Sequence, residues 1–360
     1  MKTVVIMDMY GCHNRCKHCW LSHAHNAKTM VNDFIWVCEQ FKDYRINGKS
    51  PFNDLEFMSW FREPDFADNY KELWKLEKQL STTKTPHFEL ASIWRLVRDK
   101  SYTLWLKGLG VDCVQVTLFG TEKNTDHFSG RKGAFIELMS AIEVMLSNGI
   151  VPRIQIFPFT TTIGDFKDIQ DILVDIHLEE RINKLGKESA FYFHLPAPDG
   201  EAFNLENIRI RRRDAQRLPD YLMQKTLKHF KADSMEKLWK TEAELMPTLL
   251  KQEKPLNENP PVPALMVASD FNVYPNSGEI ASWCCLGNLK TDGVDAVMDN
   301  YLNRHTLGLK MNHEMPVSYF ARKYGNSQGD RLYTTGTDLM LKWFRLEGMD
   351  SQKGQHAIGN

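Results

Sequence analysis

Three cysteines lie within eight residues near the start of the chain, in the stretch GCHNRCKHCW. They are Cys12, Cys16 and Cys19, and they directly follow the first apolar run, TVVIMDM. Three thiolates can hold a zinc ion together with a fourth ligand, or three corners of an iron–sulfur cube whose fourth iron stays open. The surrounding Gly, His, Asn, Arg and Lys residues argue against thiols that are simply buried in a core. The stretch therefore predicts a metal centre.

The spacing alone leaves the kind of metal open. Structural zinc sites usually pair two closely spaced ligands with two more some distance away, whereas here all three thiols lie together. An iron–sulfur cluster needs thiolate ligands, and its vacant iron can bind a small chelating cofactor. Imidazoles for a fourth zinc position are nevertheless close by, at His13, His18, His23 and His25.

The elements that position these cysteines form a regular alternation. Six β-rich runs are expected at 3–9, 54–60, 87–92, 111–120, 150–157 and 190–196. Helical patterns follow at 28–44, 68–80, about 93–109, 134–147 and 166–183. This order predicts an α/β fold, a partial (β/α)6 barrel of parallel strands. Reactive groups in such folds lie on the loops at the carboxyl ends of the strands, and the cysteine loop has that position.

Length and composition set further bounds. The 360 residues suit one barrel with an appendage, and the formal net charge of −1 gives no reason to expect nucleic acid or an anionic membrane as partner. No apolar run approaches the ~20 residues of a membrane span, and the N-terminal stretch lacks the features of a signal peptide. Seven cysteines, an odd number whose spacing suits no disulfide framework, predict a reducing, cytoplasmic location.

The strand–helix alternation stops near residue 205. A charged helical stretch follows and contains the run Arg211–Arg213, expected to be a solvated helix start rather than a phosphate clamp. Four prolines between 251 and 263 then indicate a linker. We expect three parts: the barrel at 1–205, a helical connector with the Pro-rich linker at 206–262, and a small α+β module at 263–360.

The spacing C-x3-C-x2-C after a first strand, at the opening of such a barrel, resembles the radical S-adenosylmethionine (SAM) superfamily. The resemblance implies that Cys12, Cys16 and Cys19 bind one [4Fe–4S] cluster whose fourth iron takes the amino and carboxylate groups of SAM. It also implies that SAM is reductively cleaved to a 5′-deoxyadenosyl radical, which removes a hydrogen atom from the substrate. His18 occupies the position where the family prefers an aromatic ring near the adenine.

The stretch SWFREPDF after the second strand resembles the family's Gly-Gly-Glu-Pro motif. By this resemblance Glu63 accepts the amino group of SAM; an acidic residue placed before a helix for its dipole is the alternative. Arg62 replaces a glycine. We expect it to reach the SAM carboxylate or a substrate anion, or to pair with Asp65.

Polar residues on the fourth and fifth predicted strands resemble further SAM contacts of the family. Thr117 matches a serine that helps to hold the ribose, but Phe119 occupies the place of the family's acid, so Gln115 is a second candidate. Arg153 and Gln155 lie two apart on one strand face. Inward polar groups there are costly unless they meet a ligand or a hydrogen-bond network, and both roles remain open.

Three more residues are candidates on loops. Arg131, in a stretch that leads into a helix, is expected to bind an anion at the helix N-terminus. His194 and Asp199 follow the sixth predicted strand, in a stretch that resembles a substrate-covering loop of many family members. A solvated loop is the alternative for both.

The stretch 270–301 resembles the SPASM or twitch module that follows many radical SAM barrels. The module's Tyr-Pro-Cys cysteine is Asn276 here, while its Leu-Gly-Asn survives at 286–288. Cys38 and Cys113 fall on predicted core positions, so too few thiols remain for an auxiliary cluster. Without such an electron acceptor, we expect a redox-neutral epimerisation, rearrangement or elimination, or a decarboxylation that takes an electron from outside.

Two adjacent cysteines, Cys284 and Cys285, lie in an otherwise cysteine-free half of the chain. Epimerisation needs a hydrogen donor on the far face of the substrate radical, and a thiol S–H bond is weak enough to supply one. We predict that one of the two is this catalytic donor. Two small buried apolar residues are the alternative.

The substrate is expected to be a polar small molecule of the sugar, aminocyclitol or nucleoside type in natural-product biosynthesis. The motifs are most similar to small twitch-bearing enzymes that act on sugars, including the cytosylglucuronate decarboxylase type. The first strand begins at Thr3, which argues against a preceding leader-peptide-binding domain and so against maturation of a ribosomal peptide, the runner-up. A zinc or iron–sulfur binding protein without turnover is the alternative outside the family. The expected partner is an external low-potential electron donor of the flavodoxin or ferredoxin type.

Overall fold

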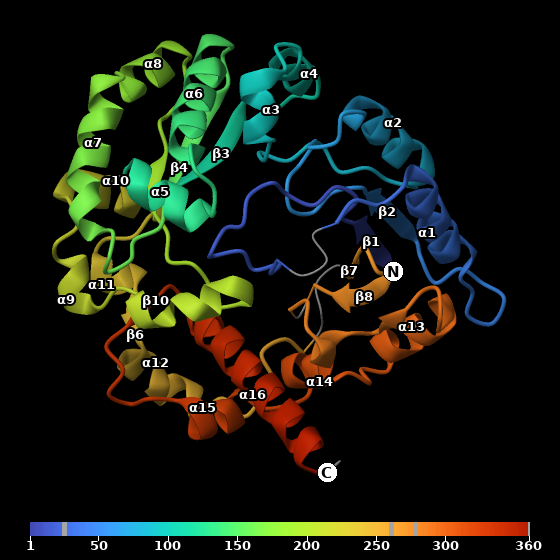
Figure 1. Ribbon diagram of the computed structural model, residues 1–360. Coiled ribbons are helices and arrows are strands. Elements are labelled where there is room, and N and C mark those ends of the chain that lie inside the picture. The colour runs from blue at the N-terminus through green and yellow to red at the C-terminus, as the bar shows by residue number, and fades with distance from the viewer. Residues whose placement is uncertain (24–26, 259–262, 277–278, 359–360) are drawn as a thin grey trace.

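The computed structural model describes residues 1–23, 27–258, 263–276 and 279–358, and two sheets form its frame (Figure 1). The first has the order β2-β1-β7-β8-β9, with β1 parallel to both neighbours and β8 antiparallel to both of its own. The second, β3-β4-β5, is parallel throughout, and β6 pairs with β10. The strands are β1 Lys2–Met7, β2 Asp54–Met58, β3 Cys113–Leu118, β4 Val151–Ile156, β5 Phe191–Phe193, β6 Lys240–Thr241, β7 Ala264–Val267, β8 Asn272–Pro275, β9 Gly287–Asn288 and β10 Leu332–Tyr333.

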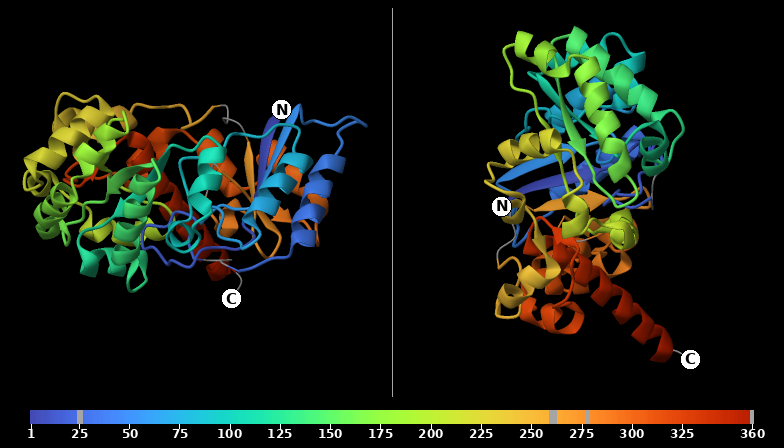
Figure 2. Two further views of the ribbon diagram at one scale, coloured as in Figure 1. Left: turned by 90° about the horizontal axis from the view of Figure 1, so that it is seen from above. Right: turned by 90° about the vertical axis from the view of Figure 1, so that its left-hand side faces the viewer.

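Helices cover the outer faces of the two sheets (Figure 2). The helices are α1 Val31–Asp43, α2 Tyr70–Leu80, α3 Ile93–Arg98, α4 Tyr102–Gly108, α5 Glu122–Ser129, α6 Ala134–Ser147, α7 Phe166–Asp175, α8 Leu178–Lys184, α9 Arg212–Ala215, α10 Asp220–Phe230, α11 Met235–Leu238, α12 Glu242–Leu249, α13 Gly293–Leu302, α14 Leu307–His313, α15 Val317–Tyr324 and α16 Gly336–Ile358. Short 3-10 turns are η1 Ile163–Asp165, η2 Gly200–Ile208 and η3 Ser282–Cys284. Among the described residues, no helix is long and apolar enough to cross a membrane.

Buried and partly exposed side chains alternate along β3, which shows which face of the second sheet packs against the helices. Val114, Val116 and Leu118 are buried and join one apolar core with α6, α7 and α10. The residues between them, Gln115 and Thr117, are partly exposed on the opposite face. Because successive side chains of a strand point to opposite faces, this face is left for polar side chains.

Five of the six strands predicted in the first half are confirmed; the one at 87–92 is wrong. This segment makes one backbone bond to the second sheet, from the Gln115 N–H to the Glu89 carbonyl (2.8 Å). Side-chain contacts hold the chain here instead: His87 bonds to Asp65, and Thr85, two residues before His87, donates to Glu56. Pro86, directly before the segment, also lacks the N–H that a ladder needs. The chain therefore crosses from β2 to β3 without a strand.

The predicted helices form, two of them in two pieces. The helix predicted at 134–147 is confirmed at both ends. The pattern before residue 109 divides into α3 and α4, because the Asp99 carboxylate accepts the Ser101 N–H and ends the first piece (2.9 Å). The pattern at 166–183 divides at His177, whose φ of +51° is incompatible with a continuous helix.

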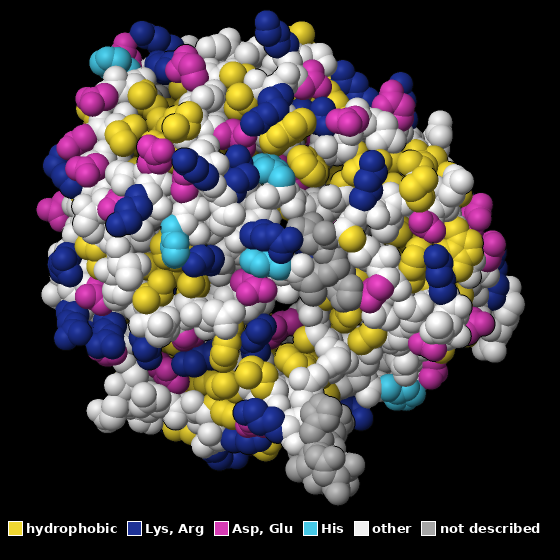
Figure 3. Space-filling model, viewed as in Figure 1, with side chains coloured by type: hydrophobic (Ala, Val, Ile, Leu, Met, Phe, Trp, Pro, Cys, Tyr) yellow, Lys and Arg dark blue, Asp and Glu magenta, His cyan; other side chains and the backbone are white. Residues whose placement is uncertain are grey.

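The C-terminal part shares a sheet with the first strand. β7 lies parallel to β1, with Val4 opposite Ala264 and Met7 opposite Val267. Apolar residues of β1, α1 and β2 pack in one core with those of β7 and α13. Positive and negative side chains are interspersed over the face shown in Figure 3, in keeping with the small net charge.

Candidate active site at the cysteine loop

The loop after β1 carries the three cysteines and is held against the end of α5. The N–H groups of Arg15 and Lys17 donate to the carbonyls of Ser129 and Phe128 (3.0 and 2.8 Å). Gly130 makes this approach possible: its φ is +66°, and a Cβ there would lie 2.4 Å from the Arg15 carbonyl oxygen. The sequence GRKG predicted a loop here, but not this contact.

The other side of the loop is covered by the segment after β5. The Glu201 N–H donates to the Cys19 carbonyl (2.9 Å). Gly200 has a φ of +50°, and a Cβ there would lie 2.3 Å from the Trp20 carbonyl oxygen. Gly130 and Gly200, from two distant segments, thus allow the backbone to pack closely against the cysteine loop on both sides.

The thiols of Cys12, Cys16 and Cys19 are all half-buried. Their sulfurs do not all lie within 4.8 Å of one another. Sulfurs around one zinc ion lie about 3.8 Å apart, given a Zn–S bond of about 2.3 Å and tetrahedral angles. The three sulfurs are therefore not arranged around a single zinc ion in this structure.

One closer group of possible ligands does exist in the described part of the chain. Ligand atoms of Cys12, His13 and Glu63 lie within 4.8 Å of one another. His13 also faces Glu137, with 3.6 Å between Nε2 and the carboxylate, and its ring stacks on Phe66. This group is the geometry that a zinc ion would use. His25, named above as another imidazole, lies outside the described residues.

Burial keeps the three thiols of the loop protonated. Burial and the nearby Glu63 raise the pKa of the Cys12 thiol, and burial and the neighbouring Cys19 raise that of Cys16 to about 12. Burial also raises the pKa of Cys19. The three groups are therefore thiols at neutral pH, and a metal centre bound by them would have to displace their protons.

Glu63 lies at the end of the loop after β2, beside Cys12. Its carboxylate is buried, accepts the Ser92 hydroxyl (2.8 Å) and lies 3.6 Å from the Cys12 sulfur. Burial raises its pKa to about 7. The structure thus brings the predicted SAM-binding acid to the first cysteine; its role stays a prediction.

Arg62 pairs with Asp8, which lies directly after β1. Asp8 also accepts the Phe61 N–H (3.1 Å), and Arg62 donates to the Leu21 carbonyl (3.3 Å). The alternative partner named above, Asp65, instead accepts bonds from His87 and Tyr102. The guanidinium therefore joins the loops after β1 and β2.

The ring of His18 lies in an aromatic group that the sequence did not predict. It is 4.9 Å from the ring of Phe119 and 4.8 Å from that of Phe157. Burial, and then the nearby His194, lower the pKa of His18 to about 4. The imidazole is neutral and has an apolar surrounding. The phenylalanines of LFG and IFPF, at the ends of two strands, were the available signal.

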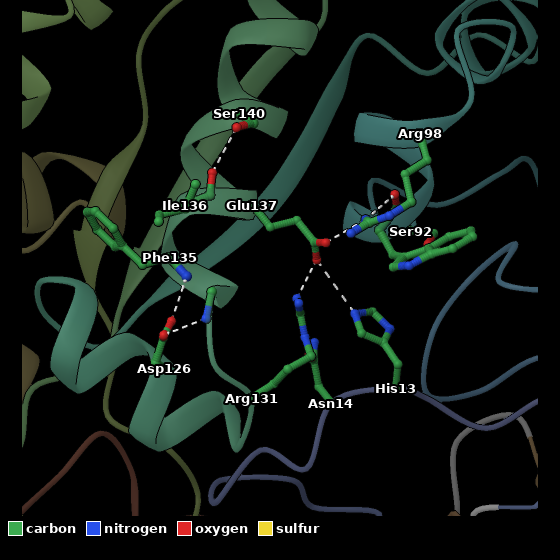
Figure 4. A network of polar contacts seen from close by, with 12 residues as sticks. His13, Asn14, Ser92, Arg98, Asp126, Arg131, Phe135, Ile136, Glu137 and Ser140 are labelled. Carbon is green, nitrogen blue, oxygen red and sulfur yellow. Dashed lines mark hydrogen bonds and ion pairs between the residues drawn. The ribbon is translucent and has the colours of Figure 1, made fainter.

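Arg131 forms part of a network around Glu137 (Figure 4). It pairs with Glu137 and donates from Nε to the Asn14 side chain (2.8 Å), and Arg98 binds the same carboxylate. Glu137 is buried on α6, an acidic residue within an otherwise apolar helix face, and sequence reasoning missed it. Arg131 thus holds the cysteine loop to α6.

Polar side chains form a strip on the inner face of the second sheet. The Tyr192 hydroxyl lies within hydrogen-bond distance of the side-chain oxygens of Gln115 (3.2 Å) and Gln155 (3.3 Å) and can donate to either one, and Arg153 donates to Gln115 (3.3 Å). Thr117 lies opposite Gln155 in the ladder. Of the two roles left open for Arg153 and Gln155, the structure brings both residues into a hydrogen-bond network.

His194 and Asp199, the two site candidates that follow β5, have different surroundings. His194 packs on Phe157, with ring centres 5.6 Å apart, and burial followed by Arg209 lowers its pKa to about 4. Asp199 instead lines a cavity of about 200 Å³ together with Cys284.

Cys284 and Cys285 differ in their surroundings, and only Cys284 lines the cavity. Cys284 is 2% exposed and lies in an apolar cluster against which Cys19 packs. Burial, and then Glu279, raise its pKa to about 12. The Cys285 sulfur lies 3.8 Å from the Gly287 carbonyl and does not line the cavity. Of the predicted core cysteines elsewhere, Cys38 is fully buried, whereas Cys113 is half-buried.

Comparisons with known proteins identify solved structures with a similar fold. No family model and no curated protein matches the chain. It is similar to the solved structure of native anSMEcpe with bound AdoMet (SAM) and Cp18Cys peptide: 12% identity, a TM-score of 0.50, and 100% of both chains covered. Weaker likenesses are to SuiB of Streptococcus suis bound to S-adenosylmethionine (12%, TM-score 0.42, 89% and 66% covered) and to the radical SAM enzyme HemN of Escherichia coli (10%, 0.40, 96% and 89%). The chain has a mixed α/β fold like that of the anSMEcpe structure, and the parallel strands predicted from the strand–helix alternation are confirmed.

Proposed function

We propose that this chain is a radical SAM enzyme whose Cys12, Cys16 and Cys19 hold one [4Fe–4S] cluster with SAM on its open iron. The observation that carries the proposal is the set of three half-buried thiols at the carboxyl end of β1, with the Glu63 carboxylate 3.6 Å from Cys12, in a chain with the fold of a SAM-bound enzyme. When bound, the pair supplies hydrogen-atom abstraction through the 5′-deoxyadenosyl radical.

The chain's own residues have supporting roles in this proposal. Glu63 accepts the SAM amino group, and the neutral ring of His18 with its two phenylalanines gives the adenine an apolar surface. Thr117 and Gln115 are candidate ribose contacts from the inner face of β3. The clamped cysteine loop excludes water from the reacting centre.

We further propose the finer architecture: a partial β/α barrel of parallel strands at 1–205, a connector at 206–262 and a twitch-like module at 263–360 whose β7 extends the first sheet. Cys284 and Cys285 are the module's cysteines. Four thiolates usually hold a cubane cluster, so the module is proposed to have no cluster of its own. An external flavodoxin or ferredoxin type donor supplies the electron for SAM cleavage.

The proposed substrate is a polar small molecule of the sugar, aminocyclitol or nucleoside type in natural-product biosynthesis. The proposed reaction is a redox-neutral epimerisation or elimination, or a decarboxylation. Modification of a ribosomally made peptide is the second candidate, because anSMEcpe was solved with a bound peptide. Incubation with SAM, a reductant and either substrate class separates the two, since the true substrate increases 5′-deoxyadenosine formation.

Cys284 is the proposed hydrogen donor if the reaction is an epimerisation. It lines the cavity, and its raised pKa keeps it as a thiol. The substrate carbon radical takes the hydrogen atom from S–H, which forms a C–H bond and leaves a thiyl radical. One electron from the external donor and one proton from water then restore the thiol.

The metal content of anaerobically reconstituted protein tests the proposal. About four irons and four sulfides per chain, lost in the triple Ala variant of Cys12, Cys16 and Cys19, are expected together with SAM-dependent 5′-deoxyadenosine. The Cys113→Ala variant is the matched control and should keep its iron. About eight irons, half of which survive the triple variant, would indicate an auxiliary cluster and oxidation. One zinc and no iron, held by Cys12, His13 and Glu63, would overturn the proposal.

A further inference from the structure

A cavity of about 200 Å³ lies beside the cysteine loop. Trp20, the residue after the third cysteine, forms one wall, and Asp199 enters from the segment that Gly200 presses against Trp20. Glu279 and Cys284 line it from the C-terminal part, together with residues of α14 and α16. The cavity therefore joins the cysteine loop to the only proposed hydrogen donor.

One buried group in this lining lacks a partner. His313 is 5% exposed, and its Nδ1 lies 2.7 Å from the Asn257 carbonyl. Because a carbonyl only accepts, Nδ1 carries the proton and Nε2 is an acceptor. Nε2 is buried and has no hydrogen-bond partner among the residues that the structure describes. A buried acceptor without a donor is unfavourable. Because His313 lines the cavity, a small shift of its ring would let a ligand hydroxyl or amine in the cavity donate to Nε2.

Two carboxylates line the same cavity. Asp199 is half-buried, accepts the backbone N–H of its own residue, and makes no ion pair within the described ranges. Glu279 is paired with Arg345, so Asp199, once ionised, is the carboxylate of the two that lacks a cationic partner. Asp338 also acts on Asp199 from α16, and its own carboxylate accepts two backbone N–H groups.

The chemistry of the lining selects the ligand. The carboxylates of Asp199 and Glu279 only accept when ionised, the asparagine and threonine side chains of the lining offer both donors and acceptors, and the indoles of Trp20 and Trp283 add apolar walls. Indole faces also attract cations. An anionic sugar acid would bring a third carboxylate to Asp199 and Glu279, so the cavity disfavours the glucuronate type named above.

We propose that this cavity binds a single-ring substrate that carries an ammonium group and hydroxyl groups, with the ammonium at Asp199 and Glu279 and a hydroxyl or amine donor at His313 Nε2. The assignment of the ligand as substrate rests on the proposed function, whereas the assignment of its chemical class rests on the cavity alone. The class that follows is an amino sugar or aminocyclitol rather than a neutral or acidic sugar.

Binding of charge-matched probes tests this without turnover. The reconstituted protein is titrated with glucosamine, 2-deoxystreptamine, glucose, myo-inositol and glucuronate, with tryptophan fluorescence and calorimetry as readouts. We expect each amine to bind at least about tenfold more tightly than its neutral counterpart, and glucuronate to bind most weakly. The preference should increase as pH rises from about 5 to about 7, because Asp199 ionises while the probe amines are still protonated.

Single-residue variants test which side chains cause the preference for amines. Asp199→Asn should reduce the preference for amines to about twofold or less while glucose binding stays the same, and His313→Phe should weaken amines and neutral polyols alike. Glu314→Gln, an exposed carboxylate next to His313 that does not line the cavity, is the control and should change nothing. Thermal melting checks that each variant is folded, and the pH series on the unmodified chain needs no variant.

The outcomes separate the two proposals. Equal binding of amines and neutral polyols, tighter binding of glucuronate, or no binding of either amine at about 10 mM would overturn the cavity assignment even if iron and 5′-deoxyadenosine are found as expected. A zinc-containing, inactive protein that still prefers amines would overturn the proposed function and leave the cavity's ligand class in place.

Discussion

The carboxylate of Glu63 and the sulfur of Cys12 lie 3.6 Å apart although 51 residues separate them in the chain. Parallel pairing of β1 with β2 brings the two loops to the same edge of the sheet. This juxtaposition places an acid beside the first thiol of the loop.

Glu63→Gln is expected to keep the iron content while weakening SAM binding by about 10- to 100-fold, because a charge-assisted hydrogen bond contributes about 1.5–3 kcal/mol. Equilibrium dialysis of SAM against the reconstituted variant measures this. Asp68→Asn, which changes an exposed acid five residues along, is the control. Loss of iron in Glu63→Gln would instead make the acid a metal ligand.

Glu137→Ala is expected to loosen the cysteine loop, because Arg131 and Arg98 lose their common partner. We expect a loss of about 1–3 kcal/mol in unfolding free energy and faster loss of iron to a chelator. Glu143→Ala, on the same helix with an exposed ion pair to Arg181, should cost about 1 kcal/mol or less. Equal losses in the two variants would contradict the network's role.

Gly130→Ala is expected to be much more damaging than Gly133→Ala. Both glycines have positive φ, so each variant has a backbone cost of about 1–2 kcal/mol. Only at Gly130 does the added Cβ meet the Arg15 carbonyl, which adds about 1–3 kcal/mol and displaces the loop. Urea denaturation and iron content of the pair measure the difference, and similar results would show that the contact is dispensable.

Cys284→Ala is expected to leave SAM cleavage intact but to abolish deuterium incorporation into an epimerised product in D2O, since the thiol hydrogen exchanges with solvent. Cys285→Ala should behave like the unmodified chain, because its sulfur lies outside the cavity lining. Mass spectrometry of the product with the true substrate distinguishes them. Undiminished deuterium in Cys284→Ala would remove it as the donor.

Asp199 should make the protein less stable as pH rises from about 4 to about 7. Burial, and then Glu279, raise its pKa to about 7 in the folded chain, above the ~3.9 of an unfolded aspartate. The folded state therefore binds this proton more tightly, and the stability this provides is complete below about 4 and lost by about 7. Asp199→Asn should show a smaller decrease in melting temperature over this window; an unchanged slope would contradict the assignment.

Local patterns in the sequence predicted five parallel strands, the main helices and the position of the cysteine loop. They failed where a residue's partner is distant in sequence. Arg62 pairs with Asp8 rather than Asp65, because His87 and Tyr102 occupy the Asp65 carboxylate. The segment at 87–92 has strand-like residues, but it makes one backbone hydrogen bond to the second sheet, and its His87 ring bonds to the distant Asp65 side chain.

The pairing of β7 with β1 could not be predicted from the sequence either, because the residues of a parallel strand do not indicate which other strand lies beside it. Val4 and Ala264 are 260 positions apart, yet they are opposite each other in the sheet that leads into the cysteine loop.

The same pairing sets the order in which the protein can mature. Ribosomal synthesis delivers β1 first and β7 long afterwards, so β1 has an open edge until residue 267 has emerged. A contact over so long a stretch of chain is slow to form. The metal centre is thus expected to enter a completed polypeptide rather than a nascent one, and a chain cut before β7 would expose that edge to aggregation.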